Sequence, residues 1–233
     1  MQEELFINQP VFLKYKHRFN WRKLRREPFI KKAIINERII EIPFVINELS
    51  RVSKGSRVLD LGCMESALPL FISGLGYKVT GFDFRKYPYR VPNFKFVQGS
   101  ILELPFKNGY FDVVTCVSTI EHVGIGFYND PKRKISADLL GINEIKRVLR
   151  PKGVFVLTVP FGKAAINNQQ RIYGKKELDE LVDGFELKEL CFYKNVKANN
   201  GNNYWQRIDL PEAEKMEYTE GTECVCTLSS WRA

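Results

Sequence analysis

Acidic side chains and one histidine follow apolar segments at places where strands are expected to end. Asp60 lies in RVLDLG, Asp83 ends KVTGFD, and the pair Glu121 and His122 lies in STIEHVG just after FDVVTCVS. A carboxylate can accept hydrogen bonds from hydroxyl groups or attract a cation, and an imidazole can take up a proton at neutral pH. These residue types therefore suit a site that holds a polar cofactor and removes a proton from a substrate.

The elements that must position these residues alternate between strands and helices. Runs rich in β-branched and aromatic residues predict strands, namely RVLDLG (57–62), KVTGFD (78–83), FKFVQG (94–99), FDVVTCVS (111–118) and GVFVLTVP (153–160). ALPLFISGLG (67–76) and ADLLGINEIKRVLR (137–150) predict helices between them, whereas Pro88 and Pro92 rule out a regular helix over residues 84–93. This alternation predicts a parallel sheet covered by helices on both faces.

The C-terminal part follows a different pattern. KKELDELVDG (175–184) predicts a helix, and FELKELCFYK (185–194) and ECVCTLSSW (223–231) predict two strands. A long polar insert without an obvious helix separates these strands, which suits an antiparallel pair at the sheet edge. We therefore expect an α/β, Rossmann-like fold with a seven-stranded, mostly parallel sheet and an antiparallel edge strand.

The N-terminal fifty residues do not join this alternation. Their isoleucines recur at helical spacing, which predicts an N-terminal helical extension of one or two helices broken near Pro43. The part between Lys14 and Lys32 holds nine Lys and Arg residues against the single acid Glu27, so it carries nearly all of the net charge of +9. We assign residues 1–50 to this basic extension and residues 51–233 to the α/β domain.

Composition argues against a membrane-spanning, secreted, disulfide-linked or metal-binding protein. No apolar stretch has membrane-spanning length and the N-terminus lacks the layout of a signal peptide, so we expect a cytoplasmic protein. The five cysteines include no C-x-x-C pair, and His17 and His122 are the only histidines. We therefore expect neither a disulfide framework nor a metal site.

The turn after the first predicted strand indicates the kind of cofactor. A dinucleotide site needs G-x-G-x-x-G, because the pyrophosphate approaches bare backbone N–H groups. Here Gly62 is followed by Met64, Glu65 and Ser66, and Glu65 would repel phosphates. S-adenosylmethionine carries a sulfonium and an ammonium instead, so Asp60 and Glu65 would attract it.

The stretch from about residue 55 to 162 resembles the class I S-adenosylmethionine-dependent methyltransferases, and most of all their type 11 small-molecule group. The motifs that carry this resemblance are VLDLGC, VTGFD, VQGSILELPFKNGYFDVV and EIKRVLRPKGVFVLTVP, in this order, and the tail RIYGKKELDELVDGFEL is also similar to the end of that group. The resemblance implies that residues 51–233 form a methyltransferase domain that binds S-adenosylmethionine.

The resemblance also implies a role for individual residues. Asp60 and Gly62 would hold the methionine end of the cofactor, with Met64 and Glu65 in the same turn, and Asp83 would accept hydrogen bonds from both ribose hydroxyls. The residues that would border the adenine and the sulfonium are Phe84, Ser100, Ile101 and Ser118. The family usually has glycine at Met64 and Ser66 and aspartate at Ser100, so a catalytically inactive methyltransferase-fold binding module is an alternative.

Glu121 and His122 are the candidates for chemistry. Methyl transfer to a hydroxyl needs alignment of the reactants and removal of a proton, which His122 could perform as a general base. In the other interpretation, Glu121 and His122 cap the following loop. Residues 159–163, the insert around residues 199–207, Arg171 and Tyr173 are candidates for lining the acceptor site.

The sequence leaves several acceptors open. We expect methyl transfer to a small-molecule or glycan-type acceptor, at oxygen. The basic extension, with Tyr15, Phe19, Trp21 and Phe29 among its cations, could instead bind RNA, which would make the protein an RNA methyltransferase. It could also bind an anionic membrane surface or an acidic substrate, or be an ordinary solvated face.

Overall fold

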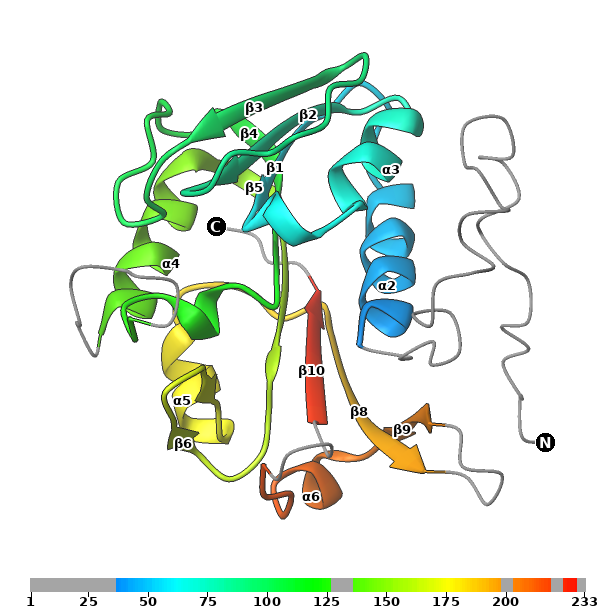
Figure 1. Cartoon of the computed structure of the whole chain (residues 1–233), viewed down its shortest axis with the longest axis vertical. Coiled ribbons are helices and arrows are strands. Elements are labelled where there is room, and N and C mark those ends of the chain that lie inside the picture. Colours follow the sequence, from blue (N-terminus) through cyan, green and yellow to red (C-terminus); the bar gives the residue numbers. More distant parts are fainter. Residues whose placement is uncertain (1–36, 127–135, 198–202, 219–223, 230–233) are drawn as a thin grey trace, which may run out of the picture. The chain divides into compact units, whose positions relative to one another are not determined.

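The computed structural model describes residues 37–126, 136–197, 203–218 and 224–229 (Figure 1). Contacts divide the chain into two units, residues 1–35 and 36–233, and every described residue belongs to the second. The basic segment 14–32 therefore lies outside the described residues. We expected the domain boundary near residue 50, but helix α2 (Arg38–Ser50) is part of the second unit.

An eight-stranded sheet runs through the described residues, with the strand order β3-β2-β1-β4-β5-β10-β8-β9. Its strands are β1 (Arg57–Leu61), β2 (Lys78–Asp83), β3 (Phe94–Gln98), β4 (Phe111–Val117), β5 (Leu149–Pro160), β8 (Glu189–Lys197), β9 (Asn203–Ile208) and β10 (Cys224–Ser229). The five strands from β3 to β5 are parallel to one another. This parallel part confirms the predicted α/β, Rossmann-like fold.

The antiparallel part differs from the expectation of seven strands. β10 is antiparallel but lies inside the sheet, between β5 and β8, and β9 is the antiparallel strand at the edge. β9 comes from the polar insert, in which we predicted no strand. It forms because residues 203–208 of the insert pair with β8 in continuous register, from Lys197 opposite Asn203 to Phe192 opposite Ile208.

Helices cover both faces of the sheet, as predicted (Figure 1). Successive strand residues point to opposite faces, so Val58 joins one core cluster and Leu59 the other. The cluster around Val58 contains residues of α2 and of α3 (Leu68–Gly74). The cluster around Leu59 contains residues of α4 (Ala137–Val148) and of α5 (Lys175–Leu181).

Helix α2 runs through Pro43 without interruption, so the predicted break near this residue is wrong. Proline lacks the N–H group that would reach the carbonyl of Ile39, but only this one helical bond is lost. Val45 and Leu49, later in the same helix, are fully buried against the sheet. Tertiary packing of this face stabilises the helix against the local penalty.

Short elements connect the main ones. They are the 3-10 helices η3 (Cys63–Glu65) and η4 (Ile120–His122), the hairpin strands β6 (Ala165–Ile166) and β7 (Arg171–Ile172), and helix α6 (Leu210–Ala213). Residues 84–93 contain no helix, as Pro88 and Pro92 predicted. Among the helices that the structure describes, none is both long and apolar enough to cross a membrane.

Candidate functional site

The predicted site residues gather at the carboxyl ends of the parallel strands. η3 follows β1, the segment with Phe84 follows β2, and η4 follows β4. In open parallel sheets, ligands bind at this edge. Two contacts tie the neighbouring strand ends together: the Gly62 N–H donates to the Phe82 carbonyl (2.8 Å), and the Gly99 N–H donates to the Asp83 carbonyl (3.0 Å).

Gly62 makes the turn after β1. Its φ of 72° lies in the left-handed region, and a Cβ atom there would lie 2.1 Å from Thr119 Oγ1 and 2.8 Å from Thr119 Cβ. Rotation of the Thr119 side chain cannot relieve a contact with its own Cβ. Only glycine therefore lets β1 and the end of β4 approach this closely.

We expect Gly62→Ala to destabilise the protein by about 2 kcal/mol or more, because backbone strain and the clash with Thr119 add up. Gly55→Ala is the matched control, since Gly55 also has positive φ (83°) but no atom within 4 Å of the added Cβ. Chemical denaturation of both variants measures the difference. Equal losses of stability in Gly62→Ala and Gly55→Ala would show that the contact between the added Cβ and Thr119 does not destabilise the protein.

Met64 and Ser66, where the methyltransferase family usually has glycine, adopt torsions that any residue can adopt. Met64 lies in η3, and Ser66 is extended with φ −124° and ψ 141°. The Met64 N–H donates to Asp83 Oδ2 (3.0 Å), which joins the turn after β1 to the end of β2. Of Glu65 the structure describes only the backbone.

Asp60 is a buried carboxylate, 2% exposed, with one unsatisfied oxygen. Oδ1 accepts a hydrogen bond from Thr115 Oγ1 (2.6 Å), while Oδ2 has no hydrogen-bond partner. Burial raises the pKa of Asp60 from 3.8 to about 7, against the lowering effects of the Thr115 bond and of Arg38. A cation that reached Oδ2 would satisfy the oxygen and favour the ionised form.

Asp83 ends β2 and is also buried. Oδ2 accepts the Met64 N–H, and Oδ1 accepts the backbone N–H of Arg85 (2.9 Å) and contacts its Nε (3.4 Å). A carboxylate oxygen can accept two hydrogen bonds, so Oδ2 has room for one hydroxyl donor. A second hydroxyl at Oδ1 would replace the long contact with Arg85 Nε.

The predicted adenine neighbours lie after β2 and β3. Phe84 is 46% exposed, and the Arg85 guanidinium lies over its ring, 5.3 Å from the centroid. Ser100 is exposed and its Oγ accepts the Leu102 N–H (3.3 Å). Ile101 is half-buried and packs against the main core cluster.

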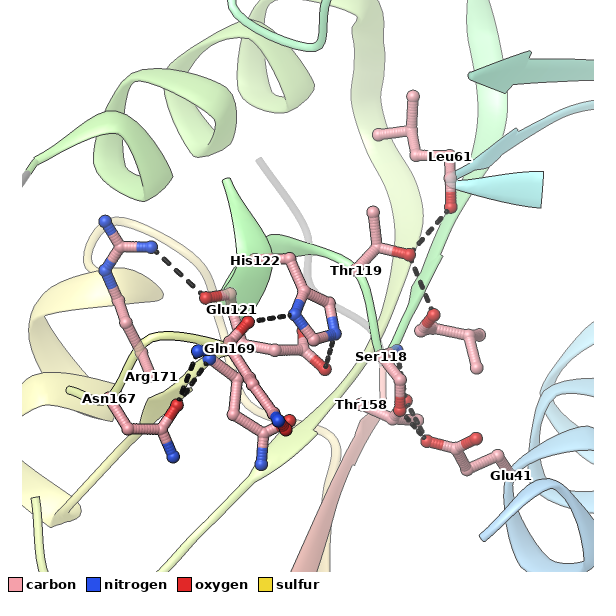
Figure 2. A network of polar contacts seen from close by, with 12 residues as sticks. Glu41, Leu61, Ser118, Thr119, Glu121, His122, Thr158, Asn167, Gln169 and Arg171 are labelled. Carbon is pink, nitrogen blue, oxygen red and sulfur yellow. Dashed lines mark hydrogen bonds and ion pairs between the residues drawn. The ribbon is translucent and has the colours of Figure 1, made fainter. Parts of the chain in front are cut away.

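Ser118 is held by a residue that the sequence analysis missed. Ser118 has a φ of 41°, which is unusual for a residue with a side chain, and its Oγ donates to Glu41 Oε1 (2.6 Å). Thr158 Oγ1 donates to the same oxygen (2.6 Å), and Arg38 Nη1 pairs with Oε2 (2.5 Å). Helix α2 thereby places the fully buried Glu41 at the ends of β4 and β5 (Figure 2).

Glu121 and His122 lie side by side in η4 (Figure 2). Glu121 is buried, its Oε2 has no hydrogen-bond partner, and burial raises its pKa to about 8. His122 Nδ1 donates to the Gln169 carbonyl (2.7 Å), and Nε2 lies 3.7 Å from Glu121 Oε1. The Glu121 carboxyl, which is mostly protonated at neutral pH, thus lies close to the His122 imidazole, and a proton could move between the two groups.

The predicted acceptor-side residues separate into different places. Arg171 and Tyr173 are buried in a network with Asp138: Arg171 Nε lies 3.5 Å from Asp138 Oδ2, and the Tyr173 hydroxyl donates to the same oxygen (3.1 Å). Residues 203–207 of the insert lie in β9, which β10 and β8 separate from β5. In the described part of the chain, no three His, Cys, Asp or Glu side chains gather as a metal site requires.

The proteins that are similar to this chain include two curated relatives and one solved structure. An uncharacterized methyltransferase of Synechocystis sp. is 29% identical over 126 residues, which are 52% of this chain and 53% of the relative. A demethylmenaquinone methyltransferase of Staphylococcus aureus is 33% identical over 116 residues, 45% of this chain and 43% of the relative. The chain thus spans about half the length of the curated relatives it matches.

The solved structure is the 1,6-didemethyltoxoflavin-N1-methyltransferase of Burkholderia thailandensis with bound 1,6-didemethyltoxoflavin and S-adenosylhomocysteine. It is 18% identical, covers 83% of this chain and 79% of its own, and superposes with a TM-score of 0.55. This likeness shows the fold of the class I S-adenosylmethionine-dependent methyltransferases.

Residues 97–218 match the family described as "Caenorhabditis protein of unknown function, DUF268". The match begins in β3 and extends beyond α6, so it includes β4, η4 and the hairpin of β6 and β7. Because it covers more than half of the chain, this protein belongs to the DUF268 family.

Proposed function

We propose that the protein is an S-adenosylmethionine-dependent methyltransferase that acts on a small-molecule or glycan-type acceptor, at oxygen. The observation that carries this proposal is the buried, unsatisfied Asp60 Oδ2 beside the Gly62 turn. An isolated buried carboxylate oxygen is costly unless a donor or a cation completes it. The methyltransferases that resemble this chain in sequence support the same function.

The residues present fit this cofactor. Asp60 would hold the ammonium of its methionine end beside Gly62, Met64 and Glu65, and Asp83 would accept hydrogen bonds from the two ribose hydroxyls. Phe84, Ser100 and Ile101 would border the adenine, and Ser118 would lie near the sulfonium. When bound, S-adenosylmethionine supplies a methyl group on a positively charged sulfur. The neighbouring carboxylates would stabilise this charge.

His122 would act as the general base. The acceptor hydroxyl must lose its proton while its oxygen gains the methyl group, and an imidazole is suited to take up that proton at neutral pH. The positive charge of the resulting imidazolium would in turn favour the ionised form of Glu121, which lies 3.7 Å from Nε2. RNA and membrane binding through residues 14–32 stay predictions, because that segment lies outside the described residues.

Calorimetric titration with S-adenosylmethionine and S-adenosylhomocysteine tests the proposal. Micromolar binding of both would support it, and tighter binding of the positively charged S-adenosylmethionine would agree with the acidic site. No binding of either compound would refute it. The remaining interpretation would then be a catalytically inactive binding module, since fold alone does not determine function.

The affinity for S-adenosylmethionine should rise about five- to tenfold from pH 6 to pH 7.5. Burial raises the pKa of the Asp60 carboxyl to about 7, so at pH 6 a proton must leave before the carboxylate can hold a cation. Because the folded-state pKa lies above 3.8, burial of Asp60 costs the free protein stability progressively as pH rises toward 7, and a bound cation offsets this cost. Calorimetry in buffers of different ionisation enthalpy should detect proton release, and Asp60→Asn should abolish both the release and the pH dependence.

A further inference from the structure

The hairpin between β6 and β7 ends in a turn that one side chain organises. Asn167 Oδ1 accepts the backbone N–H groups of Gln169 and Gln170, both at 2.8 Å. The Asn167 N–H donates to the Gln170 carbonyl (3.1 Å), which closes the turn. These three hydrogen bonds fix the backbone around Gln169 and so the direction of its carbonyl group (Figure 2).

The Gln169 carbonyl meets His122. Its oxygen lies 2.7 Å from His122 Nδ1. A carbonyl oxygen has no hydrogen to donate, so Nδ1 must carry the proton in this contact. In the neutral imidazole the lone pair is then on Nε2, the nitrogen that lies 3.7 Å from Glu121 Oε1.

Arg171, at the start of β7, fixes the backbone on both sides of His122. Its Nη1 donates to the carbonyls of Val123 (2.6 Å) and Glu121 (3.2 Å). The side chain is 4% exposed, and its Nε pairs with Asp138 Oδ2 (3.5 Å). The hairpin thus supports η4 at two points, through one carbonyl and one guanidinium.

We propose that Asn167 and Arg171 are positioning residues that hold His122 as the Nδ1–H tautomer, so that Nε2 is the atom that accepts the proton of the acceptor. This inference rests on the proposed function, which gives the reason for a base at this edge of the sheet. The O–H bond of the acceptor would break, with its proton moving to Nε2, and an electron pair of the oxygen would form the new bond to the methyl carbon. The bond between that carbon and sulfur would break, leaving its electron pair on the sulfur of the departing S-adenosylhomocysteine. The resulting imidazolium carries a proton on each nitrogen.

Several titratable or charged groups face the Glu121 and His122 pair and act on any proton there. Arg38 lowers the pKa of Glu121, whereas Glu41 raises it. Among the described residues, the groups around this pair are Glu37, Arg38 and Glu41 at the start of α2, Cys116 in β4, Arg171 in β7, Tyr173 after it, and Asp138 in α4.

Nitrogen NMR of histidine-labelled protein tests the tautomer without any acceptor. The chain has two histidines, so His17→Gln assigns both imidazoles. We expect neutral His122 to be protonated on Nδ1. Asn167→Ala should change the ratio of the two tautomers about tenfold toward Nε2–H. Asn167→Asp should restore the wild-type ratio, because its carboxylate accepts the same two N–H groups.

Arg171→Lys should shift the tautomer ratio in the same direction. Its matched control is Arg147→Lys, since Arg147 also bridges two backbone carbonyls, those of Leu104 (2.8 Å) and Phe106 (2.7 Å), and pairs with a carboxylate. If Arg171→Lys does not fold, the two Asn167 variants still decide the question.

The possible outcomes separate the inference from the proposed function. Nε2–H as the main tautomer in wild type, or equal ratios in Asn167→Ala and Asn167→Asp, would overturn the inference even if S-adenosylmethionine binds. The predicted tautomer in a protein that binds neither S-adenosylmethionine nor S-adenosylhomocysteine would instead overturn the proposed function.

Discussion

Asp83→Asn should weaken binding of S-adenosylmethionine at least about 100-fold, because two charge-assisted hydrogen bonds to the ribose hydroxyls would be lost or reversed. The change also places an NH₂ group opposite the N–H of Met64 or of Arg85, each of which now donates to this carboxylate. Binding of S-adenosylhomocysteine should fall equally, since both compounds carry the same ribose. Calorimetry with each compound measures both losses.

Asp112→Asn is the matched control. Asp112 is also a buried strand carboxylate that accepts a backbone N–H, that of Arg57 (2.7 Å), and pairs with an arginine, Arg150 (3.0 Å). It lies at the start of β4, at the amino ends of the parallel strands, whereas the candidate site lies at their carboxyl ends. Asp112→Asn should therefore lower stability without changing affinity for the cofactor. Equal affinity losses in both variants would assign the effect to general destabilisation.

The parallel half of the fold could be predicted because its strands are rich in β-branched and aromatic residues and are bounded by turns. β5 alone is much longer than predicted, because it begins at Leu149. KVTGFD forms β2 over the predicted residues, and FDVVTCVS forms β4 with one residue fewer. The antiparallel half was harder to predict. NYWQRI lies within a polar insert, and only its pairing with β8 makes it a strand, so local composition alone did not indicate β9.

The candidate site was predictable where the chain delivers residues at strand ends. Asp60, Gly62 and Asp83 lie in the segments that most resemble a methyltransferase, and the structure brings them together. Glu41 lies outside those segments and reaches the site through packing of α2. A signal for it existed: Glu41 and Glu48 are seven residues apart on the face that also carries Val45 and Leu49, and an acid on an apolar helix face must find a partner.

The contacts of the hairpin could not be predicted from sequence. Asn167 lies in a polar stretch typical of a turn, but nothing local relates it to His122, 45 positions earlier in the chain. The contact depends on a backbone carbonyl, which every residue possesses. Residue type therefore carries no information about it, and only the path of the chain shows which carbonyl faces the imidazole.

Glu41→Ala should destabilise the protein by about 3 kcal/mol. The change removes the carboxylate to which Arg38, Ser118 and Thr158 donate, and all three donors are buried or half-buried. Ser118 would lose the hydrogen bond that helps hold it at a φ of 41°, beside the expected position of the sulfonium. We therefore expect weaker binding of S-adenosylmethionine as well. Glu41→Gln should retain most affinity, since its amide oxygen can still accept from both hydroxyls.

Glu48→Ala separates the two effects of Glu41. Glu48 is also buried in α2, on the same face, and also pairs with an arginine three residues away, Arg51 (2.8 Å). Its loss should lower the midpoint of thermal unfolding but leave cofactor affinity unchanged below that midpoint. Among the described hydrogen bonds, those that Ser118 Oγ and Thr158 Oγ1 donate go to Glu41. If Glu48→Ala weakened binding as much as Glu41→Ala does, α2 would act on the site only through its packing. If only Glu41→Ala weakened binding of S-adenosylmethionine, the Glu41 carboxylate itself would hold Ser118 in the geometry that the cofactor requires.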